Sequence, residues 1–313
     1  MRVFVAGGTG AVGQSMIPQL LAAGHEVTAI SRSPAKADAL GRQGVRALTC
    51  DAFDPAGLAR VVADAAPDAI IHQLTDLPAR MDVRKLGEVY ARNNRARREG
   101  TRNLLDAARR ASVPRFIVQS MGTWYRPEGG DIKTETDPLW SDAPEPIGEA
   151  VRTVIGMEKA VLRDVPDGIV LRYGGFYGPC TWYAPDGDVT HQLRRRMFPV
   201  IRPGSGITSF IHVDDAAAAA VAALGAPPGI YNVADDEPAR ASDWIPAFAD
   251  AAGAPPPRRV PEFLARLVLG RALTAWVTTM RGASNARARA QLSWSPRYPT
   301  WRIGFRAIFR QGT

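Results

Sequence analysis

A glycine-rich run near the start of the chain is the feature that most restricts its fold. The run follows an apolar stretch at residues 2–6 and leads into a helical pattern at residues 11–23. It reads Gly7-Gly8-Thr9-Gly10-Ala11-Val12-Gly13. Glycines allow a tight turn and a close approach of backbone N–H groups, and a helix N-terminus attracts negative charge. We therefore expect a dinucleotide pyrophosphate to bind here, against Gly7, Thr9, Gly10, Ala11, Val12 and Gly13.

Short apolar runs alternate with helical patterns through the first half of the chain. The expected strands are residues 2–6, 26–31, 45–50, 69–73, 115–120 and 168–173, and the expected helices are residues 11–23, 34–43, 55–65, 82–110 and 145–163. This alternation predicts right-handed crossovers and a parallel sheet that is covered on both faces. We expect an α/β fold, a Rossmann-like doubly wound parallel sheet, with a smaller and mostly helical C-terminal substrate lobe.

The residue composition changes after Tyr173, and this change marks the expected domain boundaries. Residues 174–206 are rich in glycine, proline and aromatic residues, with a short basic helix at 190–197. Strands at 209–213 and 230–233 flank a helix at 214–224, and a long helix is expected at 261–280. We assign residues 1–175 and roughly 209–235 to the nucleotide-binding domain. Residues 176–208 and 236–313 form the expected substrate lobe.

Composition excludes several classes of protein. Of the 313 residues, 46% are hydrophobic and 22% are charged, which predicts a folded chain with a large core. Two cysteines cannot form a disulfide framework, so we expect a reducing, cytoplasmic compartment. We find no signal peptide and no membrane span. The +8 net charge is spread along the chain, and the four histidines are scattered, so we expect neither nucleic-acid binding nor a metal site.

The end of the second expected strand indicates which dinucleotide is bound. A site for NAD(H) usually carries an acid there for the ribose 2′-hydroxyl. This chain instead has Ser31, Arg32 and Ser33, with Lys36 one helical turn further on. Two cations and two hydroxyls suit a 2′-phosphate, so we predict NADP(H) rather than NAD(H). Elsewhere along the expected sheet edge, Asp51 and Ala52 would contact the adenine, and Leu74 and Thr75 would border its ribose.

Further motifs resemble one family over nearly the whole chain. They are residues 50–54 (CDAFD), 100–105 (GTRNLL), 171–179 (LRYGGFYGP), 210–215 (FIHVDD), 231–233 (YNV), 284–286 (SNA) and 294–296 (WSP). With the glycine run, they resemble the extended short-chain dehydrogenase/reductase superfamily in its NAD(P)-dependent epimerase/dehydratase branch. The resemblance implies a sheet of about seven strands. It also implies cofactor contacts from Tyr173, Gly175 and Phe176.

The resemblance also implies a catalytic Ser or Thr after the fifth strand and a Tyr-x-x-x-Lys pair on the next helix. None of the seven tyrosines has a lysine four residues later. The position of Glu158 places the expected Tyr at Ala150 and the expected Lys at Val154. Met121 stands at the expected hydroxyl position, and Arg97 and Gly175 stand where the family pattern has asparagines. We therefore interpret the chain as an atypical member without the usual acid/base pair.

Three interpretations of its chemistry remain open at this point. In the first, a carbonyl reduction or oxidation or an epimerisation uses a relocated acid or base. The candidates are Ser120, Thr123, Tyr125, Tyr177, Tyr183 and His191. In the second, the reaction needs little acid help or is a redox-neutral lyase, isomerase or cyclase step. In the third, the protein is a non-catalytic, cofactor-sensing binding module.

The expected substrate side combines aromatic and basic residues. Its candidates are Trp124, Trp182, Arg194 and Arg281. They suit a small organic substrate, either a nucleotide sugar or a natural-product intermediate with aromatic character. The expected helix at 261–280 would be a lid over this pocket or a dimer surface, so a homodimer stays open.

Overall fold

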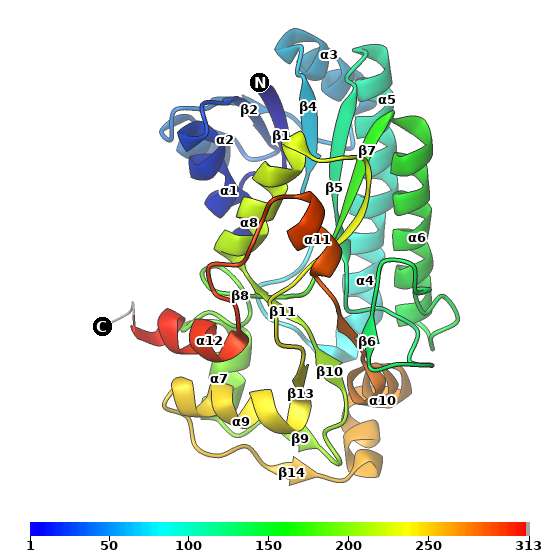
Figure 1. The fold of residues 1–313 in the computed structure, drawn as a ribbon, viewed down its shortest axis with the longest axis vertical. Helices are drawn as coiled ribbons and strands as arrows, with labels where there is room; N and C mark the ends of the chain where they lie inside the picture. The colour runs from blue at the N-terminus through cyan, green and yellow to red at the C-terminus, as the bar shows by residue number, and fades with distance from the viewer. Residues whose placement is uncertain (311–313) are drawn as a thin grey trace.

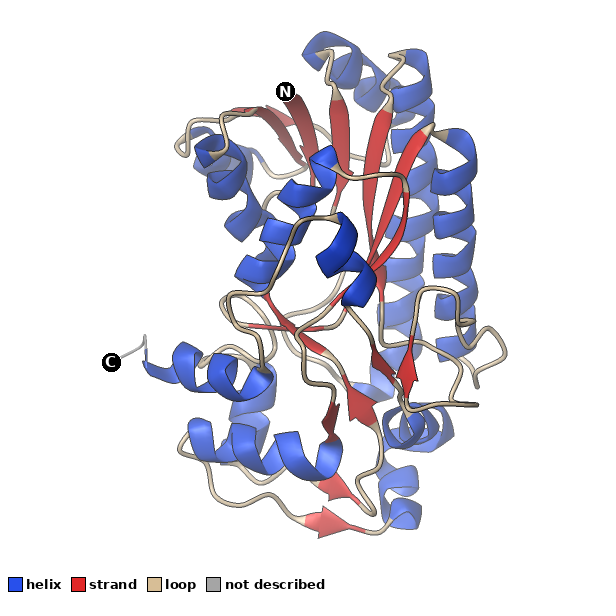
Figure 2. Cartoon of the chain, in the orientation of Figure 1, coloured by secondary structure: helices blue, strands red, loops and turns tan. Residues whose placement is uncertain are grey.

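A seven-stranded parallel sheet forms the larger part of the molecule (Figure 1, Figure 2). The computed structural model describes residues 1–310. The strands are, in spatial order, β12 (Gly229–Val233), β7 (Asp167–Tyr173), β5 (Arg115–Met121), β4 (Ala69–His72), β1 (Arg2–Ala6), β2 (Glu26–Ser31) and β3 (Arg46–Thr49). All neighbouring strands run parallel. The structure therefore confirms the predicted Rossmann-like sheet.

Helices cover both faces of this sheet, as Figure 2 shows. One face packs against α1 (Ala11–Ala22), α2 (Pro34–Gly41), α8 (Val213–Ala222) and α11 (Ala286–Gln291). The other packs against α3 (Pro55–Ala65), α5 (Thr101–Arg110) and α6 (Ile147–Asp164). Each face has its own apolar core, because strands between two helical layers are buried on both sides. All four residues of β4 are buried, for example.

The expected helix at 82–110 is interrupted, which corrects the sequence prediction. The segment contains the short 3₁₀ turn η1 (Val83–Lys85), α4 (Leu86–Arg95), the π-helical turn η2 (Ala96–Gly100) and α5. The periodicity of apolar residues alone does not distinguish a π turn from a continuous helix. A π turn holds one residue more than an α turn and so changes which side chains face the core.

Smaller elements build the C-terminal lobe. Its helices are α7 (Asp188–Arg194), α9 (Ala241–Ala251), α10 (Glu262–Thr279) and α12 (Trp301–Arg310). Its short strands are β6 (Ile132–Lys133), β8 (Gly175–Tyr177), β9 (Val200–Ile201), β10 (Ile207–Thr208), β11 (Phe210–His212), β13 (Ala239–Arg240), β14 (Arg259–Val260) and β15 (Gly282–Ala283). The 3₁₀ turn η3 (Ala223–Gly225) follows α8 and packs against the large sheet. An aromatic core joins α7, α9, α12 and β11. In Figure 1 this lobe lies below the carboxyl ends of the large sheet.

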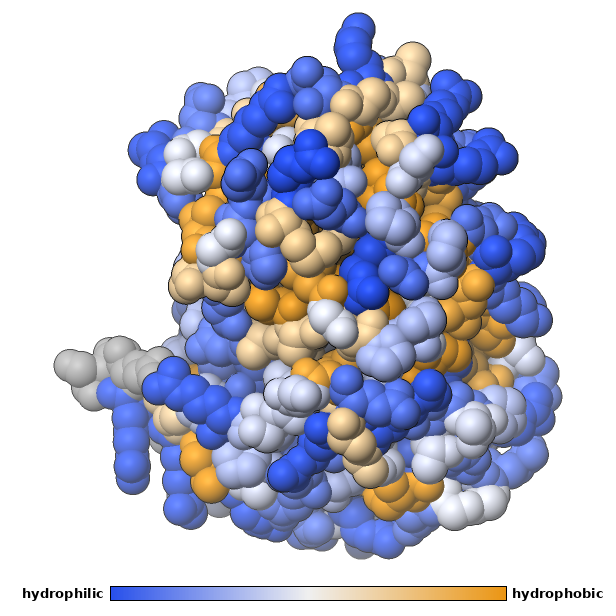
Figure 3. Space-filling view, turned by 45° about the horizontal axis from the view of Figure 1, so that its top comes forward, coloured by the Kyte–Doolittle hydropathy of each residue, from blue (hydrophilic) through white to orange (hydrophobic). Residues whose placement is uncertain are grey.

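Two helices of this lobe differ from their predicted bounds. The basic helix expected at 190–197 runs from 188 to 194, and Arg196 takes a left-handed φ of 55° just beyond it. The helix expected at 261–280 is divided at Gly270, whose φ is 76°. Within residues 1–310, no helix is long and apolar enough to cross a membrane. Figure 3 shows a mostly polar face with hydrophobic patches across its middle.

Candidate active site

The turn between β1 and α1 requires its glycines for steric reasons. Gly7 has a φ of +100°, and a Cβ on it would lie 2.6 Å from the carbonyl carbon of Gln73. A Cβ on Gly13 would lie 2.3 Å from the carbonyl oxygen of Gly7. Gly7 is therefore held against the end of β4, and α1 packs directly on the loop. Both contacts are with backbone, which cannot move aside.

The same turn leaves an open cradle at the N-terminus of α1. Gly10 is the N-cap, no side chain caps the helix, and no acidic residue lies in its first turn. A Cβ on Gly10 would meet only the oxygen of Gly7, at 3.4 Å, so its outer side is free. Thr9 and Ala11 border this space, whereas the Val12 side chain packs into the core. Free N–H groups beside backbone without side chains fit the pyrophosphate of a dinucleotide.

The residues after β2 provide exposed positive charge. Arg32 and Lys36 are exposed and make no ion pair within residues 1–310. The Ser33 hydroxyl accepts a hydrogen bond from the N–H of Lys36 and caps α2. The Ser31 hydroxyl accepts from the N–H of Ser33. The two cations are thus free to bind a phosphate, and the two serines fix the turn that presents them.

The predicted adenine contacts lie at the neighbouring strand ends. Asp51 is exposed, and its carboxylate accepts a hydrogen bond from the N–H of Phe53 at 2.9 Å. The carbonyl of Ala52 accepts from the buried amide of Asn103 at 2.9 Å. Leu74 and Thr75 follow β4, where the Leu74 backbone lies next to the glycine turn. The structure therefore brings these four predicted contacts to the same sheet edge as the phosphate cradle.

The three predicted cofactor contacts at and after the end of β7 lie in surroundings that differ from one another. The Tyr173 ring is fully buried, and its hydroxyl donates to the carbonyl of Ala216. Gly175 and Phe176 belong to β8, which pairs with β11. Phe176 is half-buried, and its ring lies 5.2 Å from that of Tyr173. The side chain of Tyr173 therefore contributes to the core between β7 and α8, and the other two residues lie at the start of the C-terminal lobe.

Two candidate acid/base residues belong to a buried hydrogen-bond network. Ser120, at the end of β5, donates to Glu158 on α6. Glu158 forms an ion pair with Arg172 at 2.7 Å, and Arg172 also donates to the hydroxyl of Tyr125 at 3.1 Å. That hydroxyl donates to Asn232 at 2.6 Å. Burial raises the pKa of Tyr125 to about 12, so this phenol stays protonated and ties the loop after β5 to β7 and β12.

The positions that the resemblance assigns to the Tyr-x-x-x-Lys pair are apolar. Ala150 and Val154 lie on α6 and are both 0% exposed. They belong to one cluster with Tyr90, Trp124 and Trp276, from α4, the loop after β5 and α10. Side chains from three elements thus fill the region beside this part of α6. Neither residue can donate or accept a proton.

The other acid/base candidates are dispersed. Tyr177 and Tyr183 pack edge-on against Phe210 in the aromatic core of the C-terminal lobe. Burial raises the pKa of both phenols above its ordinary value. His191 is exposed on α7. Thr123 is buried beside α10, where its carbonyl accepts from the Trp276 indole at 3.1 Å. The structure therefore does not bring these four residues into one group with Ser120 and Tyr125.

The predicted substrate contacts also separate into different places. Trp124 is 3% exposed and follows β5. The Trp182 indole donates to the carbonyl of Pro78 at 2.9 Å and so joins two loops at the mouth of the sheet. Arg194 is exposed on α7 and donates to the carbonyl of Pro185. Arg281 is half-buried and lies 3.9 Å from Asp131. Trp124 and Trp182 lie in loops at the mouth of the sheet, and Arg194 belongs to the C-terminal lobe.

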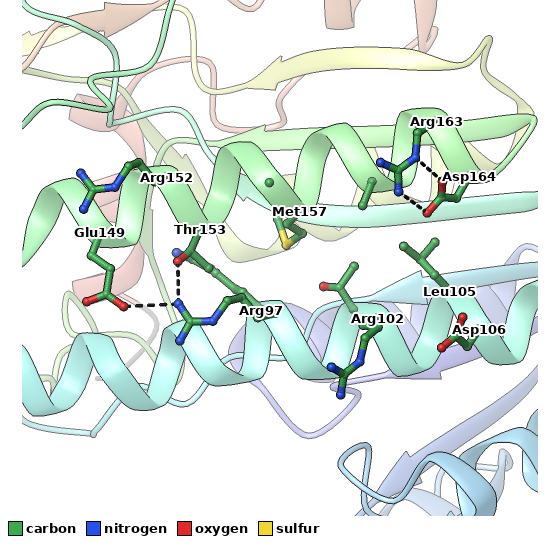
Figure 4. A pocket seen from close by; sticks show the side chains of 14 residues that line it. Arg97, Arg102, Leu105, Asp106, Glu149, Arg152, Thr153, Met157, Arg163 and Asp164 are labelled. Atoms are coloured by element: carbon green, nitrogen blue, oxygen red, sulfur yellow. Dashed lines mark hydrogen bonds and ion pairs between the residues drawn. The ribbon is translucent and has the colours of Figure 1, made fainter.

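A groove lies elsewhere, between η2–α5 and α6, and Arg97 and Arg98 are among the residues that line it (Figure 4). It has a volume of about 510 Å³ and is rimmed by arginines and carboxylates. Arg98 reaches across it to Glu149 and Thr153. Because this groove lies on the outer side of two helices, it is separate from the phosphate cradle.

A parallel sheet with a glycine cradle at its carboxyl edge defines a dinucleotide-binding protein of the Rossmann type. Comparison with known proteins makes the assignment more specific. The family model described as "NAD dependent epimerase/dehydratase family" matches residues 3–234. The chain belongs to this family, and the resemblance inferred from the motifs is confirmed.

Individual relatives cover almost the whole chain. A "3-diazoavenalumate denitrifying reductase" from Streptomyces sp is 42% identical over 97% of this chain and 99% of its own length. The UDP-glucose 4-epimerase structure from Thermotoga maritima, with UDP-glucose, has a TM-score of 0.78 and 18% identity, covering 100% and 99% of the two chains. A human "epimerase family protein SDR39U1" structure with NADPH has a TM-score of 0.73 and 22% identity, covering 99% of both chains. The two structures show the shared fold alone.

One buried cation was not recognised as a site residue in the sequence. Arg97, on η2, is 3% exposed and makes no side-chain hydrogen bond or ion pair within residues 1–310. The signal was present, since Arg97 replaces the asparagine that the family pattern has there. Its burial could not be predicted, because it depends on the π turn.

Proposed function

We propose that this protein is an NADP(H)-dependent reductase that replaces the diazo group of an aromatic substrate by hydrogen and releases N₂. The observation that carries the proposal is the apolar region around Ala150 and Val154. A carbonyl reduction produces an alkoxide, which needs an acid at the reacting oxygen. A site without such an acid suits a reaction in which the leaving group departs as a neutral molecule.

The proposed step balances without a proton from the protein. The glycine cradle at the start of α1, with Arg32 and Lys36, would hold the dinucleotide, which when bound would supply the hydride. At the aryl carbon of a diazonium ion a C–H bond would form, the C–N bond would break, and its electron pair would leave with N₂. The diazonium is reduced and NADPH is oxidised to NADP⁺. The chain itself binds and orients both reactants, and it excludes water through the aromatic cluster that includes Trp124 and Trp276.

Two further observations support this proposal. The 42% identical relative is named as a denitrifying reductase of a diazo compound. In addition, the unpaired Arg32 and Lys36 suit the 2′-phosphate of NADP(H). The interpretations with a relocated acid, with a redox-neutral step or with no turnover each predict a different result in the experiment below.

Isotope tracing tests the proposed function. Purified protein, NADPH and the diazonium derived from 3-amino-4-hydroxycinnamate should yield 4-hydroxycinnamate and one N₂ for each NADPH oxidised. Deuterium should pass to the ring from only one of the two C4-deuterated NADPH stereoisomers, because a folded site presents one face of the nicotinamide. In D₂O with ordinary NADPH, the ring should carry no deuterium at that carbon. A reaction without protein measures the uncatalysed background.

Ring deuterium from solvent, or no protein-dependent N₂, would overturn the proposal. Turnover of carbonyl substrates instead would support the relocated acid. Turnover with unchanged nicotinamide absorbance would support a redox-neutral step, and cofactor binding with no turnover would support a binding module.

A further inference from the structure

Four buried residues, on α4, on η2 and in the loop after β5, have polar atoms without partners. These atoms are both amide atoms of Asn94, Nη1 of Arg97, Oγ1 of Thr123 and Nε1 of Trp124. All four side chains are more than nine-tenths buried. Burying a polar group without a hydrogen bond destabilises the fold, and burying an unpaired charge destabilises it more. A cluster of this kind is therefore typical of a site that a ligand completes.

Arg97 is the most costly member of the cluster. Its guanidinium carbon lies 5.2 Å from the centre of the Trp124 ring, which compensates only part of the lost hydration. Glu158 is nearby, but its carboxylate already binds Arg172 and Ser120. Burial lowers the pKa of Arg97 to about 10, so the guanidinium remains positive at neutral pH. The site thus holds a cation without a counterion among residues 1–310.

The π turn explains how an arginine comes to be buried here. Arg95 on α4 and Arg98 on η2 flank Arg97, and both side chains are more than half exposed, in ion pairs with Glu99 and Glu149 respectively. Arg97 instead is buried against the Trp124 ring and is also among the residues that line the groove between η2–α5 and α6. It comes from a turn whose extra residue changes which side of the helix its side chains face. Such turns occur often at functional sites.

The surroundings of the cluster connect it to the substrate side of the sheet. The charge of Arg97 acts on His72, the last residue of β4, and Trp124 follows β5. Ligands of open α/β sheets bind outside these carboxyl ends. Asn93 binds the backbone of Asp76 after β4, and Trp276 of α10 binds the backbone of Thr123. The loop after β4 and α10 therefore border the cluster.

We propose that Arg97, Asn94, Thr123 and Trp124 bind a carboxylate of the substrate. Every one of these side chains can donate a hydrogen bond, and an excess of donors around one cation suits a group with two anionic oxygens. This inference rests on the proposed function for the identity of the substrate, an aromatic diazo acid. It goes beyond that function by assigning the recognition of the acid group to a buried arginine.

Equilibrium binding tests the proposal independently of turnover. The probes are 4-hydroxycinnamate, which carries the carboxylate but no diazo group, and its carboxamide, each titrated against the protein with NADP⁺. The wild type should bind the carboxylate roughly 10- to 100-fold more tightly, as a charged hydrogen bond is worth about 1.5–3 kcal/mol. Arg97→Gln should remove this preference and leave NADP⁺ affinity unchanged. Arg97→Lys should keep part of it.

Matched variants separate binding from folding. Arg98→Gln, one residue further along η2 and exposed, should keep the full preference for the carboxylate. If Arg97→Gln does not fold, the affinities of the wild type for the two probes still test the proposal. Thr123→Val, titrated with the same two probes, tests it as well. Equal affinity of the wild type for carboxylate and carboxamide would overturn the proposal. An equal loss of affinity for both probes in Arg97→Gln would overturn it too. Neither result depends on N₂ release, so a failure of the proposed function remains distinguishable.

Discussion

Arginine has different roles in this chain according to what each side chain touches. Most of the 39 basic residues are arginines, and many make exposed ion pairs of small energetic value, such as Arg163 with Asp164. Arg172 is buried and fully paired with Glu158, where it holds strands together. Arg32 is exposed and unpaired within residues 1–310, and Arg97 is buried and unpaired there. The charges of these last two arginines are therefore available to a ligand anion.

At this residue scale, Arg32→Ala should change cofactor choice. The substitution removes a cation from the proposed 2′-phosphate site, so the Kd for NADPH should rise roughly 10- to 100-fold, while the Kd for NADH changes little. Quenching of protein fluorescence in titrations with both cofactors measures this. Arg42→Ala, an exposed arginine at the other end of α2, is the matched control and should leave both affinities unchanged. Equal affinities of the wild type for the two cofactors would refute the preference for NADP(H).

At the scale of elements, the β1–turn–α1 unit combines local sequence and close packing. Gly7 faces the end of β4, and Gly13 faces Gly7, so the loop can form only if both lack side chains. The free N–H groups at the start of α1 depend on this closeness. The π turn η2 is a second element that combines local backbone geometry with close packing, because it places Arg97 inside the molecule.

Gly13→Ala should therefore abolish dinucleotide binding and destabilise the fold. The new methyl group would lie 2.3 Å from a backbone oxygen, so α1 must move away from the loop. We expect a loss of stability of about 1–3 kcal/mol, as in other overpacked cores, together with no detectable NADPH binding. Urea unfolding and cofactor titration measure the two effects. Gly87→Ala in α4, where a Cβ meets nothing within 4 Å, should instead leave binding intact and stabilise by up to about 1 kcal/mol.

At the scale of the whole molecule, the two lobes meet around a buried carboxyl group. Asp235 follows β12, is 1% exposed, and its backbone N–H donates to Phe210 of β11 at 2.7 Å. Its Oδ1 accepts from the N–H of Glu237. The backbone N–H groups of Glu237 and Trp301 act on this carboxyl to lower its pKa, but the effect of burial is larger. Burial raises the pKa of Asp235 from 3.8 to about 8, so the folded protein holds a proton there that the unfolded chain releases.

The contribution of Asp235 to stability should consequently fall as pH rises. Between pH 3.8 and about 8, the folded state binds more protons at Asp235 than the unfolded state does, so this group lowers the free energy of unfolding as pH rises. Buried His72, whose pKa is lowered to about 3, acts in the opposite direction below pH 6.5. Asp235→Asn removes only the Asp235 titration, so the free energy of unfolding should rise more steeply, or fall less steeply, with pH in the variant than in the wild type. Urea unfolding at several pH values measures it. Asp250→Asn, at an exposed aspartate on α9, is the control and should retain the slope of the wild type. A slope in Asp235→Asn as steep as in the wild type would contradict the assignment.

The sequence by itself determined the fold and the cofactor cradle. Both follow from local signals: the glycine run at 7–13 can serve one kind of turn, and apolar runs alternating with helices lead to a parallel sheet. The missing Tyr-x-x-x-Lys pattern was also visible as residue types at fixed spacing. The Ser33 and Asp54 caps of α2 and α3 lie at the predicted helix starts for the same local reason.

Only the tertiary structure decided how distant polar residues are used. Tyr125 and Ser120 fit the pattern of catalytic residues, yet their hydroxyls bind Asn232 and Glu158, which lie 107 and 38 residues away. Tyr177 and Tyr183 fit it too, but long-range packing places them in an aromatic core. The sequence showed that Arg97 replaces a family asparagine, but only the π turn and the packing against Trp124 show that it is buried without a partner within residues 1–310. Spacing along the chain specifies secondary structure, whereas desolvation and pairing depend on which elements fold together.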